Sequence, residues 1–269
     1  KCRDKKIAVY QDKIKKIIFL EKYSFNKKKY FNYRNKFKKL FGKIYKKIDV
    51  NKKKYIEKLN DDKRRVIQFK KLCKNKEILD FGCGWGDFLI QLKNTKKKYA
   101  YEIRNECLKN LKQNKINIIK NINVFNKKVD IITMFHVLEH LPSQINTLKI
   151  LKEKLKHNGK IIIEIPHAND VLISKIKLKK FFDFTFISEH LILHTSDSIK
   201  KILFKAGFKN IKIKYFQRHN LNNFLSWIIN GKPGGHNNFK ISSKQSLIKF
   251  EEYLIKHKIT DTLIITAEK

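Results

Sequence analysis

Three glycines at alternate positions follow a short apolar run, and this spacing is the strongest chemical signal in the chain. Residues 77–89 read EILDFGCGWGDFL, so that Asp80 is followed by Gly82, Gly84 and Gly86. Glycine tolerates positive φ and lacks a Cβ, so such a turn can press backbone N–H groups against a ligand. The segment therefore predicts a strand, a tight turn and a helix start that together hold a ligand by the backbone.

Histidines follow the expected strands, where they could accept a proton from a substrate. They are His136 and His140 after 129–135, His167 after 160–165, His190 and His194 in the next segment, His219 after 211–216, and His236 in a glycine-rich loop. Open α/β sheets bind ligands at the carboxyl ends of their strands, and a histidine of pKa near 6.5 is a suitable base at neutral pH. Any single histidine of this kind is more often a structural hydrogen-bonder than a base, and His136 with His140 could simply cap and pack the turn.

Glu139 lies between His136 and His140 in sequence, which raises the question of a metal ion. The spacing i, i+3, i+4 lacks an evident further carboxylate, and this makes the metal signal weak. We therefore predict no metal site from the sequence.

The elements that must position these residues alternate between strand and helix. The predicted strands are 99–103, 116–119, 129–135, 160–165, 211–216 and 262–267, and the predicted helices are 106–114, 143–157 and 196–206. Runs such as Ile161–Ile163 are continuously apolar, as in the strands of a covered parallel sheet. Gly159 and Gly207 are expected to cap helices in the left-handed conformation. This alternation predicts a doubly wound α/β fold.

The chain divides into an N-terminal cap and a core domain. Residues 1–62 predict a cap or lid, with a hairpin formed by 7–10 and 17–20 and helical segments around 30–41 and 55–59; a solvated helical extension is the alternative. The core domain, 63–269, opens with a helix over 63–74 whose apolar stripe faces the sheet. Substrate-side insertions are expected at about 166–195 and 218–258.

The amino-acid composition limits which binding partners and which cellular compartment we expect. The 269 residues carry a formal charge of +39, but the excess is Lys spread along the chain, so we expect no specific nucleic acid partner. The four cysteines form no C-x-x-C pair, which excludes a zinc ribbon and indicates a reducing cytoplasm. No apolar run reaches the roughly 18 residues of a membrane span, which leaves only peripheral membrane contact open.

The sequence around the glycine turn, ILDFGCGWG, resembles motif I of class I S-adenosylmethionine-dependent methyltransferases. Glu102 is placed like the ribose-binding acid of that family, DIITMFHVLEHL (130–141) looks like its fourth strand and the motif after it, and NGKIII (158–163) resembles the turn into strand five. The resemblance implies a Rossmann-like, mostly parallel seven-stranded sheet with an antiparallel last strand, and S-adenosylmethionine as cofactor. The implied cofactor-binding residues are Asp80, Gly82, Cys83, Gly84, Gly86, Glu102, Ile103, Asn121, Ile122 and Phe135.

A second resemblance concerns the acceptor. The segments EHL (189–191), TSDS (195–198), AGF (206–208), QRH (217–219) and GKPGGH (231–236) look like methyltransferases of bacterial surface-polysaccharide gene clusters. This implies O-methylation of a sugar or sugar-linked precursor of capsule or lipopolysaccharide, phosphate-bearing or nucleotide-activated. The acceptor would contact His167, His194, Arg218 and His236. For the general base we choose His190 first, then His140 and His136.

Two rival functions remain. A nucleic-acid methyltransferase would suit the charge, but Phe135-His136-Val137 differs from the Asn/Asp-Pro-Pro-aromatic motif of base amino-group methylation, and Ile165-Pro166 offers no cysteine nucleophile. The other rival is a noncatalytic or dehydrogenase-type nucleotide-binding domain, which lacks a second catalytic domain here and leaves the histidines unexplained.

Overall fold

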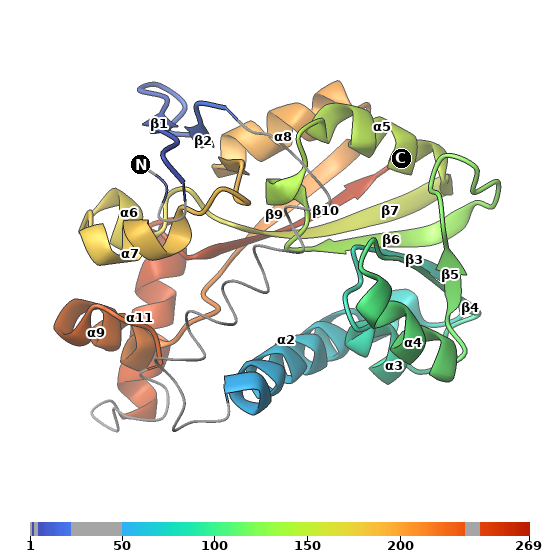
Figure 1. Ribbon diagram of the computed structural model, residues 1–269, viewed down its shortest axis with the longest axis horizontal. Helices are drawn as coiled ribbons and strands as arrows, with labels where there is room; N and C mark the ends of the chain where they lie inside the picture. The colour runs from blue at the N-terminus through green and yellow to red at the C-terminus, as the bar shows by residue number, and fades with distance from the viewer. Residues whose placement is uncertain (1, 3–4, 23–49, 235–242) are drawn as a thin grey trace. The chain divides into compact units, whose positions relative to one another are not determined.

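A computed structural model describes residues 2, 5–22, 50–234 and 243–269, with the backbone alone for 50–59 (Figure 1). The predicted helical segment at 30–41 and His236 lie outside the described residues. The main sheet has seven strands in the order β5-β4-β3-β6-β7-β10-β9. The contacts within the chain define two compact units: residues 1–23, 135–152 and 160–269 form the first, and 24–134 with 153–159 the second.

The second unit contains the strand–turn–helix segment. Its elements are α2 (Val50–Cys73), β3 (Glu77–Phe81), α3 (Asp87–Gln91), β4 (Lys97–Tyr101), α4 (Asn105–Gln113), β5 (Asn117–Ile119) and most of β6 (Val129–Phe135). β3 pairs in parallel with both β4 and β6, and β4 pairs in parallel with β5. Ile78, Leu79 and Ile132 of these strands are fully buried, and each contributes roughly 1.5–3 kcal/mol by leaving water.

The first unit contains the antiparallel end of the sheet. Its elements are η1 (Leu138–His140), α5 (Gln144–Glu153), most of β7 (Leu155–Pro166), α6 (Val171–Ser174), α7 (Lys179–Thr185), β8 (Ile192–Leu193), α8 (Ser196–Lys205), β9 (Lys209–Phe216), α9 (Leu221–Asn230), α11 (Lys244–Lys256) and β10 (Thr262–Glu268). β10 runs antiparallel to both β7 and β9, and the three strands lie side by side in Figure 1. The predicted fold, a mostly parallel doubly wound sheet with an antiparallel last strand, is confirmed.

A small second sheet ties the N-terminus to the segment that carries His190. The predicted hairpin forms as β1 (Val9–Gln11) and β2 (Ile18–Leu20), and β2 also pairs with β8. Ile18 and Leu193 pack in one buried cluster with Ala168, Ile173 and Phe186. The hairpin therefore holds part of the predicted 166–195 insertion in place.

Several boundaries in the structure differ from those predicted from the sequence. The helix expected over 143–157 ends at Glu153, and Gly159 lies in β7 rather than capping a helix. The amide of Val129 donates to the Lys154 carbonyl at 2.9 Å, so backbone pairing ends the helix early. Gly207 does follow α8 with φ 86°, as expected. The predicted boundary at residue 62 falls inside α2.

Among the described residues, no helix is both long and apolar enough to cross a membrane.

Candidate active site

The glycine turn adopts the conformation that its sequence predicts. Gly82, Gly84 and Gly86 have φ angles of 80°, 62° and 81°, in the left-handed region that favours glycine. A Cβ on Gly86 would collide with the side chain of Leu111 in α4. The turn thus needs glycine for both its backbone angles and its packing.

Glu102 directly follows β4 and is bound to this turn. Its Oε2 accepts the Gly84 amide at 2.7 Å, and the Arg104 guanidinium donates to both carboxylate oxygens at 3.1 and 3.0 Å. Burial alone would raise the pKa of Glu102, but the Arg104 hydrogen bonds and the amides of Arg104 and Gly84 together lower it. Glu102 is therefore a carboxylate at neutral pH, held against the backbone of the glycine turn.

The other predicted cofactor residues lie at, or shortly after, the carboxyl ends of parallel strands. Asp80, at the end of β3, is buried and accepts a hydrogen bond from Thr133 Oγ1 of β6 at 2.7 Å. Cys83 and Ile122 are buried, Ile103 is half-buried, Asn121 is exposed and follows β5, and Phe135 ends β6. Asp80, the glycines and Glu102 gather around β3 and β4, which is the arrangement that the sequence predicts.

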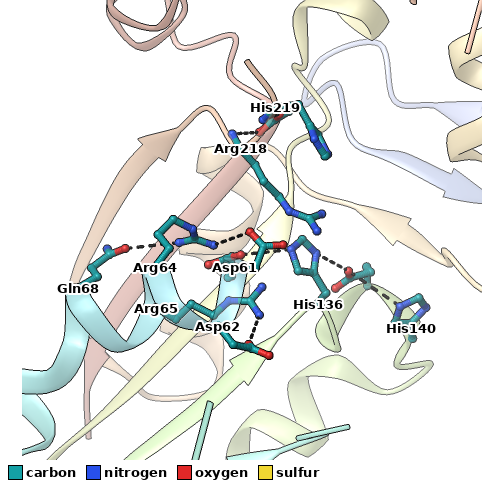
Figure 2. A network of polar contacts seen from close by, with 12 residues as sticks. Asp61, Asp62, Arg64, Arg65, Gln68, His136, His140, Arg218 and His219 are labelled. Atoms are coloured by element: carbon teal, nitrogen blue, oxygen red, sulfur yellow. Dashed lines mark hydrogen bonds and ion pairs between the residues drawn. The ribbon is translucent and has the colours of Figure 1, made fainter. Parts of the chain in front are cut away.

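His136 begins a second group of polar side chains, in the first unit. Its Nδ1 lies 3.4 Å from Glu139 Oε1 and its Nε2 lies 3.3 Å from Glu164 Oε1 (Figure 2). Burial alone would lower the pKa of His136, but the two carboxylates outweigh it and raise the pKa, although the Arg218 guanidinium, turned toward His136 in Figure 2, opposes them. The φ of His136 is +53°, a conformation of the kind that costs a non-glycine residue about 1–3 kcal/mol and is often found at functional sites.

Glu139 is the buried centre of this group. Its side chain is 2% exposed, and Oε1 lies 4.0 Å from His140 Nε2. Burial would raise the pKa of Glu139, but the hydrogen bond to His136 and the other nearby histidines lower it to about 2. Within the described part of the chain, its buried Oε2 has no hydrogen-bond partner.

His140 and His190 come together although they are fifty positions apart. Their ring centroids lie 5.0 Å apart, and the Nδ1 atoms lie 2.8 Å from the carbonyl oxygens of Glu189 and Thr185 respectively. Because a carbonyl only accepts, each Nδ1 carries a proton, and in the neutral imidazole this leaves the lone pair on Nε2. Burial and the neighbouring His140 lower the pKa of His190 to about 4, so His190 is neutral at pH 7.

The predicted acceptor-binding residues are less accessible. His194 is buried, and its two ring nitrogens contact Ser198 Oγ at 2.9 Å and Gln144 Oε1 at 2.7 Å. His167 is buried, and its Nδ1 lies 3.0 Å from the carbonyl oxygen of Thr260. The Arg218 amide donates to Asp261 at 2.9 Å. The geometry gives His194 and His167 structural hydrogen bonds, and their contact with an acceptor stays a prediction.

Sequence reasoning missed three partners of the predicted residues. Arg104 pairs with Glu102, Thr133 donates to Asp80, and Glu164 pairs with His136. The sequence offered two signals. They are the basic residue Arg104, two positions after Glu102, and the carboxylate of Glu164 inside the otherwise apolar run 161–165.

Comparison with known proteins identifies the architecture. Residues 52–213 match a family model described as "Methyltransferase domain". A SAM-dependent methyltransferase from Archaeoglobus fulgidus superposes with a TM-score of 0.54 at 22% identity, covering 86% of this chain and 98% of that one. One from Thermotoga maritima gives 0.53 at 16% identity, covering 82% and 96%. At these identities the two structures show the fold alone.

Two curated relatives carry the same name, tRNA U34 carboxymethyltransferase. The protein from Nautilia profundicola is 24% identical over 181 residues, covering 56% of this chain and 58% of that protein. The protein from Aliarcobacter butzleri is 25% identical over 155 residues, covering 52% and 49%. The chain thus spans about half the length of these relatives.

Proposed function

The chain belongs to the methyltransferase-domain family, and from this premise we propose that it transfers the methyl group of S-adenosylmethionine to an acceptor oxygen. The observation that carries the proposal is the glycine turn with Glu102 bound to the Gly84 amide. S-adenosylhomocysteine is then the product.

For the cofactor, we assign the methionine portion to the glycine turn and the ribose hydroxyls to Glu102. Asp80 supports the turn and the cofactor's amino group. Hydrogen bonds to a charged group contribute about 1.5–3 kcal/mol each. Because the Arg104 guanidinium donates to both oxygens of Glu102, the carboxylate must serve Arg104 and the ribose together. Ile103, Asn121, Ile122 and Phe135 are assigned to the adenine.

For the acceptor, we propose a hydroxyl of a sugar or sugar-linked precursor of a surface polysaccharide. Methyl transfer is an in-line displacement in which the oxygen bonds to the methyl carbon and the C–S electron pair leaves with the thioether. Positioning supplies about 7–11 kcal/mol of barrier reduction, and the hydroxyl must also lose its proton. The group formed by His136, Glu139, His140 and His190 is suited to that second task.

Within this group, His190 and His140 are our candidates for handling the proton. Both present a bare Nε2 lone pair, because backbone carbonyls hold their Nδ1 protons. His136 lies between two carboxylates, and we assign it the positioning of Glu139.

RNA is the second candidate acceptor. The curated relatives are named for tRNA, and the chain carries a formal charge of +39. The charge supports electrostatic attraction to phosphates without itself giving sequence readout.

The acceptor is tested by transfer of a labelled methyl group from S-adenosylmethionine to a panel of nucleotide sugars, lipid-linked glycans and bulk tRNA. We expect label in a carbohydrate. We also expect RNA to bind only with steep loss of affinity as salt rises, as diffuse Lys charge predicts. A salt-tolerant complex with one RNA, together with label in that RNA, would replace the carbohydrate proposal by the RNA one.

A further inference from the structure

We propose that Glu139, His140 and His190 form a binding site for one divalent transition-metal ion, for which Zn²⁺ is the best-matched ion. The three side chains come from η1 and from the segment that precedes β8. None of the three ligands is among the residues assigned to the cofactor, which belong to the other unit apart from Phe135.

The ligand atoms are already gathered. One nitrogen from each histidine and one Glu139 oxygen all lie within 4.8 Å of one another. Bonds of about 2.0–2.2 Å place tetrahedral ligand atoms about 3.4 Å apart, so small side-chain rotations close the site. The Leu191 amide donates to the Glu139 carbonyl at 2.9 Å, which fixes the backbones of the two segments to each other.

The hydrogen bonds around the histidines are those that metal ligands need. The Nδ1 protons of His140 and His190 are donated to the carbonyls of Glu189 and Thr185, both at 2.8 Å. Such partners fix the tautomer and direct Nε2 toward an ion. In each ring the nitrogen left for an ion is therefore Nε2, without a change of tautomer.

Glu139 supplies the negative charge. Its side chain is buried, and its Oε2 has no hydrogen-bond partner among the residues that the structure describes. A buried polar atom of this kind requires an explanation, because leaving it unpaired costs free energy. The carboxylate faces His140 through Oε1, which lies 4.0 Å from His140 Nε2 and 3.4 Å from His136 Nδ1. A cation bound between this carboxylate and the two imidazoles compensates its buried charge, while His136 lies between Glu139 and Glu164.

The ligand types select the ion. Two imidazoles and one carboxylate suit Zn²⁺ and its transition-metal neighbours, whereas Mg²⁺ and Ca²⁺ prefer oxygen ligands. Three protein ligands leave an open coordination position, as in catalytic zinc sites.

The chemical use of this ion rests on the proposed function. An acceptor hydroxyl in the open position becomes more acidic and releases its proton to solvent water. Its oxygen then bonds to the methyl carbon as the C–S pair leaves with the thioether. In this arrangement the histidines act as ligands, because a lone pair that binds metal cannot also accept a proton.

Metal binding is measured on tag-free protein stripped with a chelator, in the absence of S-adenosylmethionine. We expect calorimetry to show one Zn²⁺ per chain. Co²⁺ should give visible absorption typical of nitrogen and oxygen ligands, without a thiolate charge-transfer band. His140→Ala, His190→Ala and Glu139→Gln should each weaken Zn²⁺ binding by about tenfold or more. The control His157→Ala removes an exposed histidine of the other unit and should bind as the parent does.

The parent protein alone keeps the proposal falsifiable if a variant fails to fold. No Zn²⁺ binding by the parent, a Co²⁺ spectrum with thiolate bands, or folded ligand variants with parental affinity would each overturn it. Glu102→Ala should keep parental Zn²⁺ affinity, so failure of the cofactor assignment and failure of the metal site give different results.

Discussion

Replacing His190 by alanine is expected to lower kcat by about 10²–10⁴-fold, while affinity for S-adenosylmethionine stays within a factor of a few. The Nε2 lone pair of His190 is needed whether it accepts the acceptor's proton or binds a metal ion. Its Nδ1 proton is committed to the Thr185 carbonyl, so no other atom of the ring can replace Nε2. The measurement is steady-state turnover with the acceptor that the labelled panel identifies.

Two comparisons make this result interpretable. His157→Ala should keep parental kcat, because His157 is exposed and lies in the other unit. Added imidazole should restore part of the lost rate if His190 is a base, whereas the loss should follow Zn²⁺ occupancy if it is a ligand. Near-parental kcat in folded His190→Ala at saturating acceptor would remove His190 from both roles. A loss found only in His140→Ala or His136→Ala would then place the chemistry on the residues that follow β6.

Glu102→Ala should weaken S-adenosylmethionine binding by about tenfold or more, because it removes the acceptor of charge-assisted hydrogen bonds to the ribose. It also removes the carboxylate to which both Arg104 and the Gly84 amide donate. The dissociation constant from calorimetry is the measurement.

Glu106→Ala is the matched control for this substitution. Glu106 Oε1 lies 4.0 Å from Arg104 Nη1, and the Glu106 side chain is 55% exposed. Glu106 therefore approaches the same guanidinium as Glu102 does, without binding the glycine turn. We expect parental affinity in Glu106→Ala. Equal affinities in parent and Glu102→Ala would show that the ribose assignment is wrong.

The fold was predictable because its signals are local. The apolar runs of β3, β6 and β7 and the glycines of the turn each specify a conformation within a few residues. The end of α5 was not predictable in this way. Pairing of Lys154 with Val129, distant in sequence, overrides the helical pattern beyond Glu153.

The candidate site shows the same division. The glycines were assigned from their spacing and Glu102 from the family resemblance, and the structure brings them together. The pairing of Glu164 with His136 depends on the register between two strands, and the approach of His190 to His140 depends on the Leu191–Glu139 backbone bond. Neither contact can be predicted from the local sequence. Glu139 became a strong ligand candidate only because the structure places His190 near it.

The central claim is that the glycine turn with Glu102 binds S-adenosylmethionine. Calorimetric titration of the parent protein with S-adenosylmethionine and, separately, with NAD tests it most directly. The account predicts saturable binding of one S-adenosylmethionine per chain and no measurable heat from NAD. Saturable binding of NAD without binding of S-adenosylmethionine would contradict it.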